Sequence, residues 1–597
     1  MKRLLAALFA AVLLLSAFAF CQPSASSLIA NIPDRRTVSL NGAWHFLADP
    51  YNTGGVYRMW ENENPATADG RVIEYDFDAA PVLNVPGDWN SQREKLYFYE
   101  GALWYKTSFS YTKRPNTRTF LHFGAANYKT VVYLNGAKLG DHEGGFTGFN
   151  FEITDNIKDG QNILVVEVNN ARRAEYVPAL ATDWWNYGGI TRDVKVVEVP
   201  ESFVENYFIQ LAKGSGNEIA GWVKLNGAKQ SEQVTIEIPE AGIKKTITTD
   251  ANGRAEFRVP AKLTLWSPEN PKLYDVRIAS SSDTVRDQIG FRTIETQGTK
   301  ILLNGKPVFL RGISIHEEAP FRGGRAFSED DDRTLLTWAK ELGCNYVRLA
   351  HYPHNENMTR LADRMGLMVW SEIPVYWDTA WTNSATLKVA QEMLRDNIAR
   401  DQNRASIVLW SIANETPITP ERTEFLKNIA TYARQLDSTR LLTAAMNRTD
   451  SAANMTRTLS DPLGQYLDVL GLNEYVGWYE SKIEDMDKIN WVNPYDKPLL
   501  ISEFGAETPY NVHGPADQKW NEEYQVRVYE NQLKMLSKIP SMTGMSPWLL
   551  MDFRSPRRMI TNVQDYYNRK GLVSDQGQRK KAFYVLQKYY REKTSQQ

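Results

Sequence analysis

The chain has 597 residues, with 69 basic and 71 acidic side chains. Its formal charge of −2 argues against a nucleic-acid-binding protein, which would usually carry a basic surface. The length predicts several domains, and the hydrophobic (42%) and charged (23%) fractions argue against extensive disorder. Two cysteines exclude a disulfide scaffold and a Cys-rich zinc site. Aromatic residues make up 12% of the chain, which indicates either large cores or surfaces that stack on flat ligands.

Residues 1–20 are typical of a secretory signal peptide. A basic start precedes an uncharged apolar run that ends in the small-residue pattern Ala17-Phe18-Ala19. We expect export, to the periplasm or out of the cell. Lipid anchoring through Cys21 is the alternative, although Phe20 is bulkier than a lipoprotein signal normally allows. The remaining Cys344 has no partner, so we expect no structural disulfide.

Two β modules are predicted before residue 298. Residues 37–200 contain short alternating strands broken by turn residues, and the Asn135-Gly136 pair between apolar runs is a strong hairpin signal. This pattern predicts a β-sandwich of jelly-roll type. Residues 201–297 repeat the pattern in a smaller unit, whose length suits an immunoglobulin-like sandwich.

From residue 298 to 597 the period changes, because apolar strand-like runs now alternate with amphipathic helices. Eight strands within about 300 residues predict a TIM barrel, a (β/α)8 fold whose chemistry sits at the carboxyl ends of the strands. The predicted strands are Val308–Ile315, Tyr346–Ala350, Met368–Glu372, Ile407–Ile412, Leu441–Met446, Val469–Asn473, Leu499–Glu503 and Gly544–Leu549.

Polar and aromatic residues gather at the carboxyl ends of these predicted strands, where chance would scatter them. This alignment indicates an active site at the mouth of the barrel. The residues concerned are His316-Glu317-Glu318, Arg348, His351, Glu372, Asn414-Glu415, Asn473, Tyr475, Glu503 and Trp548.

Glu415 and Glu503 are the predicted catalytic pair. Each ends a near-continuous apolar strand, and their spacing of 88 residues is about three βα units, which places them nearly across the mouth from one another. Two carboxyl groups in such a position suit glycosidic cleavage, in which one protonates the leaving oxygen and the other attacks or activates water. One group must therefore hold a proton while the other stays ionised.

Several motifs make the chain resemble glycoside hydrolase family 2. Asp401–Glu415 (DQNRASIVLWSIANE) resembles the acid/base signature of that family, and Asn345–Pro353 (NYVRLAHYP) resembles its other signature, except that Leu349 stands where a smaller residue is usual. Motifs in the first β module, Asn41–Trp44 (NGAW) and Val85–Trp89 (VPGDW), extend the resemblance over residues ~38–597.

The resemblance implies a retaining enzyme with Glu415 as general acid/base and Glu503 as nucleophile. Such enzymes hold the two carboxyl groups ~5–5.5 Å apart and pass through a glycosyl-enzyme ester. It further implies that Asn414 hydrogen-bonds the 2-hydroxyl of the sugar and that Tyr475 orients Glu503.

A second set of motifs is similar to the β-glucuronidases of this family. Asn568 and Lys570 match their Asn-x-Lys element, which grips the carboxylate of the sugar, and an ammonium group can distinguish an anionic sugar from a neutral one. Asn473–Tyr479 and Asp183–Ile190 are also similar to that subgroup, which would bring Asp183 to the sugar hydroxyls. The predicted substrate-binding residues are Asp183, His351, Asn414, Asn473, Tyr475, Tyr479, Trp548, Asn568 and Lys570.

The arginine-containing stretch Asp552–Asn568 is longer than in well-known β-glucuronidases, so a β-galacturonidase or a β-galactosidase of the same family stays an alternative. Glu372 and Glu415 are only 43 positions apart in the chain, which leaves little room for a lid and predicts an open site for the ends of oligosaccharides.

The other alternative is a non-catalytic carbohydrate-binding protein, which would have no use for the carboxyl pair. We expect neither cofactor nor metal, because His351 and His354 share one loop with unfavourable geometry for ligation. The expected partner is a carbohydrate that ends in a uronic acid. The sequence predicts neither nucleic-acid binding nor a transmembrane segment, and a homo-oligomer is left open.

Overall fold

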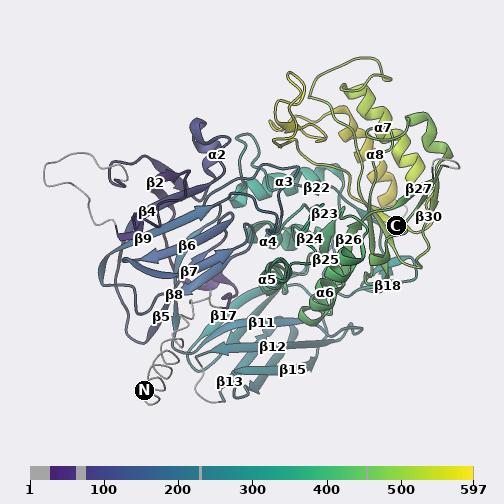
Figure 1. The fold of residues 1–597 in the computed structure, drawn as a ribbon. Helices are drawn as coiled ribbons and strands as arrows, with labels where there is room; N and C mark the ends of the chain where they lie inside the picture. The colour runs from purple at the N-terminus through teal and green to yellow at the C-terminus, as the bar shows by residue number, and fades with distance from the viewer. Residues whose placement is uncertain (1–26, 62–75, 228–230, 452–454, 596–597) are drawn as a thin grey trace, which may run out of the picture.

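The computed structural model describes residues 27–61, 76–227, 231–451 and 455–595. The predicted signal peptide, residues 1–20, and Cys21 lie outside the described residues. Figure 1 shows an N-terminal β-sandwich on the left, a smaller sandwich at the bottom and a barrel with its helices on the right. The predicted fold class is confirmed in each of these three parts.

The N-terminal sandwich packs a six-stranded sheet, order β3-β2-β4-β9-β6-β7, against a four-stranded sheet, order β1-β10-β5-β8. Asn135 and Gly136 form the predicted turn between β6 and β7, both with positive φ. The strands are β1 (Arg36–Ser39), β2 (Gly42–Asp49), β3 (Val82–Val85), β4 (Ala102–Tyr111), β5 (Thr117–Phe123), β6 (Lys129–Leu134), β7 (Ala137–Glu143), β8 (Phe149–Glu152), β9 (Gly160–Asn169) and β10 (Val194–Pro200); a short helix, α2 (Trp89–Gln92), follows β3.

The second sandwich packs a three-stranded sheet, β11-β12-β15, against a four-stranded sheet, β14-β13-β16-β17. Its strands alternate buried and exposed residues, as in β16, because one face of each sheet covers the shared core. The strands are β11 (Phe203–Leu211), β12 (Glu218–Asn226), β13 (Gln233–Ile238), β14 (Ile243–Thr248), β15 (Arg254–Pro260), β16 (Tyr274–Ala279) and β17 (Thr284–Ile289). A small antiparallel sheet leads into the barrel: β18 (Ile294–Gln297), β19 (Lys300–Leu303) and β20 (Lys306–Pro307).

The barrel strands are parallel and follow the order β21-β32-β31-β29-β26-β25-β24-β23-β22. The predicted strand Val308–Ile315 is divided into β21, which pairs with β32, and β22, which pairs with β23, so this one stretch of chain bonds to both neighbours and closes the ring. The strands are β21 (Leu310–Arg311), β22 (Ser314–Ile315), β23 (Tyr346–Leu349), β24 (Met368–Glu372), β25 (Ile407–Asn414), β26 (Leu441–Met446), β29 (Leu470–Asn473), β31 (Leu499–Glu503) and β32 (Met542–Met545).

The last predicted strand, Gly544–Leu549, begins and ends later in the chain than the strand in the structure, β32 (Met542–Met545). The structure ends β32 at Met545, so Trp548 lies in the loop after the strand, where its amide donates to Phe504 O at 2.9 Å. Two further small sheets decorate the mouth: β27 (Thr449–Ser451), β28 (Thr456–Thr458) and β30 (Asn490–Val492) in one, and β33 (Phe553–Arg554) with β34 (Tyr567–Asn568) in the other.

The barrel helices cover the outside of the strands, and α3 to α7 begin at side-chain caps. Ser328 caps α3 in a capping box with Asp331, so the helix starts at Glu329. Asn383 caps α5 in the same way by accepting from two backbone amides. The helices are α3 (Glu329–Leu342), α4 (Glu356–Met365), α5 (Ser384–Asp401), α6 (Pro420–Leu436), α7 (Glu522–Leu536) and α8 (Lys581–Ser595).

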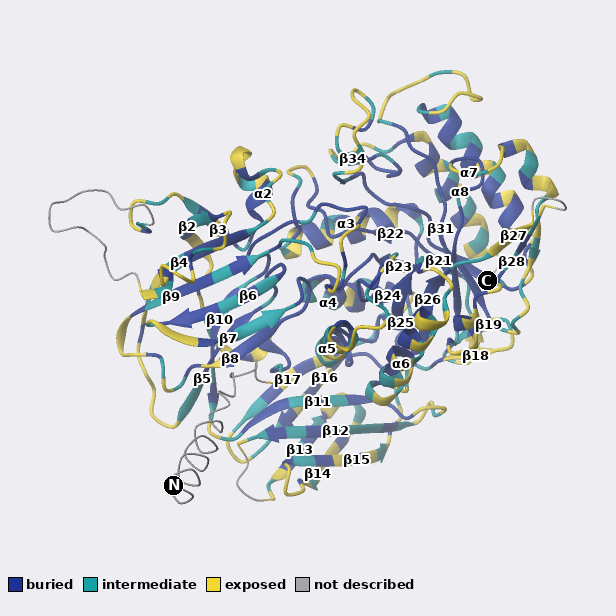
Figure 2. Ribbon diagram, viewed as in Figure 1, coloured by how far each residue is buried: buried dark blue, intermediate teal, exposed yellow. Residues whose placement is uncertain are grey.

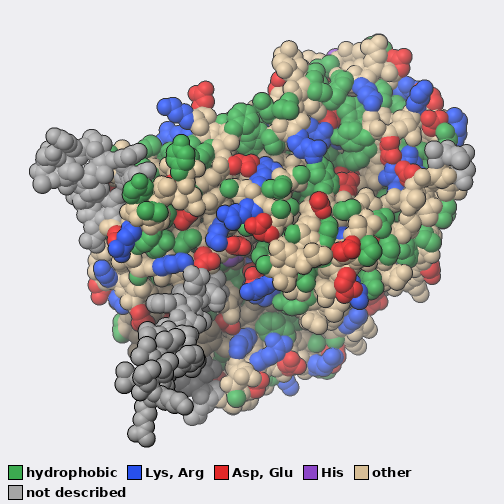
Figure 3. Space-filling model, in the orientation of Figure 1, with side chains coloured by type: hydrophobic (Ala, Val, Ile, Leu, Met, Phe, Trp, Pro, Cys, Tyr) green, Lys and Arg blue, Asp and Glu red, His purple; other side chains and the backbone are tan. Residues whose placement is uncertain are grey.

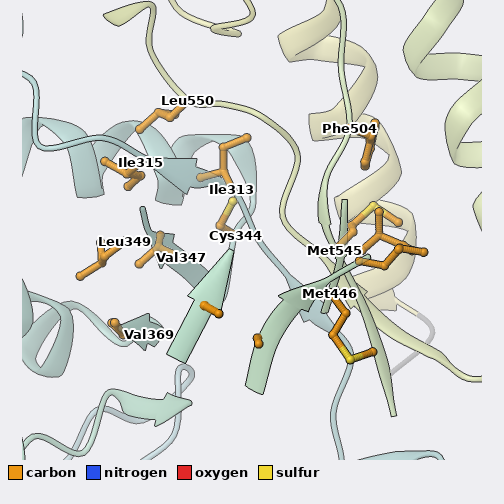
Figure 4. Packing of buried hydrophobic residues seen from close by; sticks show 14 of the residues in the cluster. Ile313, Ile315, Cys344, Val347, Leu349, Val369, Met446, Phe504, Met545 and Leu550 are labelled. Carbon is orange, nitrogen blue, oxygen red and sulfur yellow. The ribbon is translucent and has the colours of Figure 1, made fainter. Parts of the chain in front are cut away.

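Strand alternation decides which barrel residues face the helices and which face the interior. Val347 and Leu349 of β23 pack with Val369 in the layer between strands and helices (Figure 4), and the buried free Cys344 lies in the same cluster. The intervening Arg348 points to the other side, into the barrel interior, where its Nη1 donates to Glu503 Oε1 at 2.9 Å. The barrel strands β21 to β26 are buried (Figure 2).

Buried ion pairs join the three parts. Arg192 of the N-terminal sandwich binds Glu317 at 3.0 Å, just after β22. In the second sandwich, Asp287 accepts from Tyr207 at 2.7 Å and binds Arg360 at 3.1 Å and also Arg404, both of the barrel. Burial alone would raise the pKa of Asp287, but these arginines hold it below its ordinary value.

The surface in Figure 3 carries interspersed basic and acidic side chains, as the near-zero net charge predicts. Within the described ranges, none of the helices has the length and apolar character needed to cross a membrane.

We expect Asp287→Asn to lower the stability of the protein by ~3–5 kcal/mol, because it leaves two buried guanidinium groups without their anion. The stabilisation by the ionised Asp287 is present above the pKa of an unfolded aspartate and is lost as the pH falls through its lower folded value. Thermal unfolding at pH 7 and at decreasing pH measures both effects. Glu256→Gln, an exposed change in the same sandwich, serves as the control; equal melting temperatures for the two variants would contradict the prediction.

Candidate active site

Glu415 and Glu503 come to the mouth of the barrel directly after β25 and at the end of β31. Glu415 leaves its strand with φ of 51°, and its amide donates to Ala445 O at 2.9 Å, which fixes the start of its loop. Its side chain is half-buried and accepts two hydrogen bonds, from Asn473 Nδ2 to Oε1 at 3.0 Å and from Trp377 Nε1 to Oε2 at 2.9 Å. Both carboxylate oxygens are therefore held in a defined orientation.

Glu503 is more deeply buried, at 5% exposure, and accepts from Arg348 Nη1 at 2.9 Å and from the Tyr475 hydroxyl at 2.7 Å. Burial, together with the Glu415 carboxylate, raises the pKa of the Glu503 carboxyl to about 8 against the opposing effect of Arg348. This direction is opposite to the expectation that Glu503 is ionised, because two carboxyl groups share one poorly solvated site.

Arg348 is the centre of the hydrogen-bond network beneath this pair. Its guanidinium also binds Glu372 at 3.1 Å and donates to Asn414 Oδ1 at 2.7 Å. Although burial would raise the pKa of Glu372, Arg348 and His351 hold it at about 2, so Glu372 is a permanent anion. The network therefore contains one ion pair, Arg348 with Glu372, and Glu503 is the second carboxyl group that Arg348 binds.

The predicted site residues Asn414 and Asn473 lie between the two carboxyl groups. Asn473 Nδ2 also donates to Asn414 Oδ1 at 3.2 Å, and its own Oδ1 accepts from Ser502 at 2.7 Å. The buried Nδ2 of Asn414 has no hydrogen-bond partner among the described residues. A buried amide donor without a partner is costly, which is consistent with a ligand hydroxyl as its acceptor.

His351 and Trp548 form an aromatic wall next to Glu503. The His351 ring stacks on Trp548 with centroids 4.8 Å apart and lies 5.6 Å from Trp184 of the N-terminal sandwich. His351 Nδ1 contacts Glu372 at 2.8 Å and Nε2 lies 3.8 Å from Glu503. Burial lowers the pKa of His351, so the ring is a neutral donor to Glu372.

Lys570 is a buried ammonium group on the loop after β34. It is 1% exposed, and its Nζ binds Glu507 at 2.8 Å and the Tyr479 hydroxyl at 2.7 Å. The fully buried Asn568 accepts from the Lys570 amide at 3.2 Å. Burial would raise the pKa of Glu507, but Lys570 and Arg558 hold it at about 2. Tyr479, at 58% exposure, separates the ammonium from solvent.

Asp183 reaches this cluster from the N-terminal sandwich. It accepts from Arg558 Nε at 3.1 Å, from Ser555 at 2.7 Å and from Asn568 Nδ2 at 3.3 Å. Arg558 also donates to Tyr479 at 3.0 Å and to Glu507 at 3.1 Å. Two cations and two anions thus meet at this edge of the mouth.

The structure brings all eleven predicted site residues into this one region and adds three that the sequence did not single out: Trp377, Glu507 and Arg558. Arg558 belongs to the stretch whose unusual length was the available signal. Glu507 stands four residues after Glu503, but nothing in its spacing indicates a counter-ion for Lys570.

Some polar residues at the strand ends serve the fold instead. Glu317 binds Arg192, and Glu318 accepts from Tyr187 at 2.7 Å, so both hold the N-terminal sandwich against the barrel. His354 contacts Ala350 O at 2.9 Å. In the part of the chain that the structure describes, no group of three or more His, Cys, Asp or Glu residues could hold a metal ion.

Comparison with protein families matches three models in succession. Residues 37–200 match the sugar binding domain of glycosyl hydrolases family 2, residues 203–292 match a second model of that family, and residues 294–594 match its TIM barrel domain.

The chain is similar to proteins called β-glucuronidase. A putative β-glucuronidase of Formosa agariphila is 28% identical over 85% of this chain, which spans 66% of that protein's length, and the β-glucuronidase of Mus musculus is 26% identical over 94% of this chain and 91% of its own. The structure of a Ruminococcus gnavus β-glucuronidase in complex with D-glucuronic acid superimposes with a TM-score of 0.80 at 26% identity, covering 95% of this chain and 99% of that one.

We expect Glu507→Gln to destabilise the protein by ~3–5 kcal/mol, because Lys570 and Arg558 lose a buried anion that both contact. Added D-glucuronate should raise the melting temperature of the variant more than that of the wild type, whereas D-glucose should not. Differential scanning fluorimetry measures both shifts, with the exposed Glu530→Gln as the control. If the variant and the wild type have equal melting temperatures, and glucuronate does not raise that of the variant, this description of Lys570 and Arg558 is contradicted.

Proposed function

The chain belongs to glycosyl hydrolase family 2, as the resemblance in its sequence predicts, and on that premise we propose that it is a retaining, exo-acting β-glucuronidase. The observation that carries the proposal is the position of two cations bound to Glu507, the buried Lys570 and the half-buried Arg558, at the same mouth as the Glu415–Glu503 carboxyl pair. The names of the relatives support the same substrate class. The substrate would be a carbohydrate or conjugate that ends in β-linked glucuronic acid.

In the proposed reaction, Glu415 donates a proton to the glycosidic oxygen while Glu503 attacks the anomeric carbon. The glycosyl ester on Glu503 is then hydrolysed by a water molecule that Glu415 deprotonates, so the anomeric configuration is retained. Arg348 and Tyr475 donate to Glu503, which stabilises its charged form against the burial that raises its pKa. Tyr475 can act this way because burial raises its pKa well above the ordinary value and keeps its hydroxyl protonated.

The sugar would be oriented by groups on both sides of the reacting carbon. The free Nδ2 of Asn414 would donate to the 2-hydroxyl, a contact that strengthens in the transition state of such enzymes. Asp183 would accept from hydroxyls farther along the ring, and His351 and Trp548 would wall the pocket. The uronate carboxylate would bind Lys570 and Asn568, with Tyr479 displaced from the ammonium.

The proposal includes export, on the basis of residues 1–20, and action on the ends of oligosaccharides. The short connection between β24 and β25 is largely occupied by α5, which supports an open mouth. A β-galacturonidase or β-galactosidase is the alternative within the family, and a non-catalytic carbohydrate-binding protein is the alternative outside it.

Hydrolysis of p-nitrophenyl β-D-glucuronide, β-D-galacturonide and β-D-galactoside separates these functions. We expect the wild type to prefer the glucuronide and Glu503→Gln to lose more than about a thousandfold in kcat, because the glycosyl ester cannot form. Lys570→Ala should lower kcat/KM for the glucuronide by about tenfold to a hundredfold and should spare the galactoside, which has no carboxylate. If the wild type cleaves the galactoside best and Lys570→Ala does not change its kinetics, the uronic-acid assignment is refuted. If the protein binds glycosides but hydrolyses none of them, the carbohydrate-binding protein is favoured.

The pH profile of kcat/KM tests the environment of Glu503. Because its pKa is raised, the protonated and unreactive form begins to accumulate at a higher pH than the ordinary 4.5, so we expect an acid limb above that value. Tyr475→Phe removes a donor to the charged form and should move the limb to higher pH by about one pH unit. Tyr584→Phe, on the exposed face of α8, is the matched control. A limb that stays in place in Tyr475→Phe would exclude this role of the hydroxyl.

A further inference from the structure

The stretch between β33 and β34 is an ordered hairpin at the mouth of the barrel, near the N-terminal sandwich (Figure 2). Phe553 pairs with Asn568 and Arg554 with Tyr567. Beyond the strands, the Ser555 amide donates to Tyr566 O at 2.8 Å, the Tyr566 amide to Arg558 O at 2.7 Å and the Arg558 amide to Ser555 O at 3.2 Å. The backbone that carries residues 555–558 is therefore held by its own hydrogen bonds.

Two adjacent arginines of this hairpin reach opposite sides of the mouth. Arg558 binds Asp183 and Glu507, next to the predicted carboxylate end of the sugar. Arg557 instead lies over the ring of Trp377, with Cζ 4.5 Å from the centroid. Trp377 follows β24, whereas Glu507 follows β31, and three strands separate β24 from β31 in the ring.

Trp377 marks the side of the site where the leaving group must lie. Its Nε1 donates to Glu415 Oε2 at 2.9 Å, and Glu415 is the proposed proton donor to the glycosidic oxygen. The group attached to that oxygen therefore leaves past Glu415, next to the Trp377–Arg557 stack.

Among the residues that the structure describes, none is a counter-ion for Arg557. Arg557 is exposed and forms no salt bridge with any described residue, whereas Arg558 binds two carboxylates. Its one recorded hydrogen bond comes from the backbone amide, to Ser555 Oγ at 3.4 Å. A guanidinium that stacks on an indole keeps its planar edge of donors free, and that edge fits a carboxylate or sulfate through two parallel hydrogen bonds.

We propose that Arg557, stacked on Trp377, forms a leaving-group subsite that selects aglycones or neighbouring sugars carrying a carboxylate or sulfate. The inference rests on the proposed β-glucuronidase function and adds the class of leaving group. Such a subsite makes an acidic oligosaccharide a better substrate than a neutral conjugate of equal reactivity. A platform that only stacks on a neutral ring would bind charged and uncharged leaving groups alike.

The test compares three β-D-glucuronides that differ in the charge of the leaving group: those of 4-hydroxyphenylacetate, 4-hydroxyphenylacetamide and 4-hydroxyphenylmethanesulfonate. The methylene group insulates the phenol, so the acid and its amide have similar leaving ability. We expect kcat/KM of the wild type to be about threefold to tenfold higher for the acid than for the amide at low ionic strength, and the ratio to fall as salt is added. The sulfonate stands in for a sulfate group, so kcat/KM for this glucuronide relative to the acid shows whether sulfate or carboxylate is preferred.

Variants assign that ratio to Arg557. In Arg557→Gln the acid-to-amide ratio should fall to about one, and Arg557→Lys, which keeps the charge but loses the planar fork, should retain part of it. Arg258→Gln, an exposed arginine of the second sandwich that binds Glu218, is the control and should keep the wild-type ratio. Melting temperatures confirm that each variant is folded.

A wild-type ratio near one, or a ratio that survives Arg557→Gln, overturns the inference, and cleavage of the amide glucuronide then leaves the proposed function intact. If the wild type cleaves none of the three glucuronides but does cleave a galacturonide or galactoside, the proposed function fails and the inference fails with it.

Discussion

The buried guanidinium of Arg348 is the interaction on which the site depends. It lies on the inward face of β23, is 0% exposed, and binds Glu372, Glu503 and the side chain of Asn414 at once. A buried cation requires compensating anions, and Glu372 supplies one that stays charged. The second carboxyl, Glu503, can then change its protonation and its chemistry without leaving Arg348 unpaired. The barrel provides this arrangement because parallel strands present their ends side by side.

The N-terminal sandwich completes the mouth of the barrel. Asp183 and Trp184 come from a loop of the sandwich, and the Arg192–Glu317 pair and the Tyr187–Glu318 hydrogen bond fix that loop against the barrel. Residues that looked catalytic by position, such as Glu317, therefore position the site indirectly. The hairpin of β33 and β34 extends the mouth in the same way, because its two arginines reach different partners, Asp183 for Arg558 and the ring of Trp377 for Arg557.

Local patterns were sufficient for much of the fold. Apolar runs that end in a carboxylate predicted the bounds of β25 and β31 to within two residues. A strand buried on both faces is a continuous apolar run, and such a run has clear ends in the sequence. Ends that depend on tertiary contacts were less predictable. Val308–Ile315 divides into two short strands because it must bond to both neighbours where the ring closes, and β32 ends early because the chain turns to bring Trp548 beside His351. The aromatic content also divides accordingly: Trp44, Trp89 and Trp410 are core residues, while Trp184 and Trp548 wall the site.

The sequence by itself determined the family, the barrel and the strand ends that carry Glu415 and Glu503, because these follow from strand periodicity and from motifs within single βα units. Only the tertiary structure decided the charge environment. Glu507, Arg558 and Asp183 are far apart in the chain, yet they share the surroundings of Lys570. The raised pKa of Glu503 arises from burial and from Glu415, which follows a different strand, β25. Electrostatic interactions depend on distance and solvent exposure in space, and neither quantity is encoded in local sequence spacing.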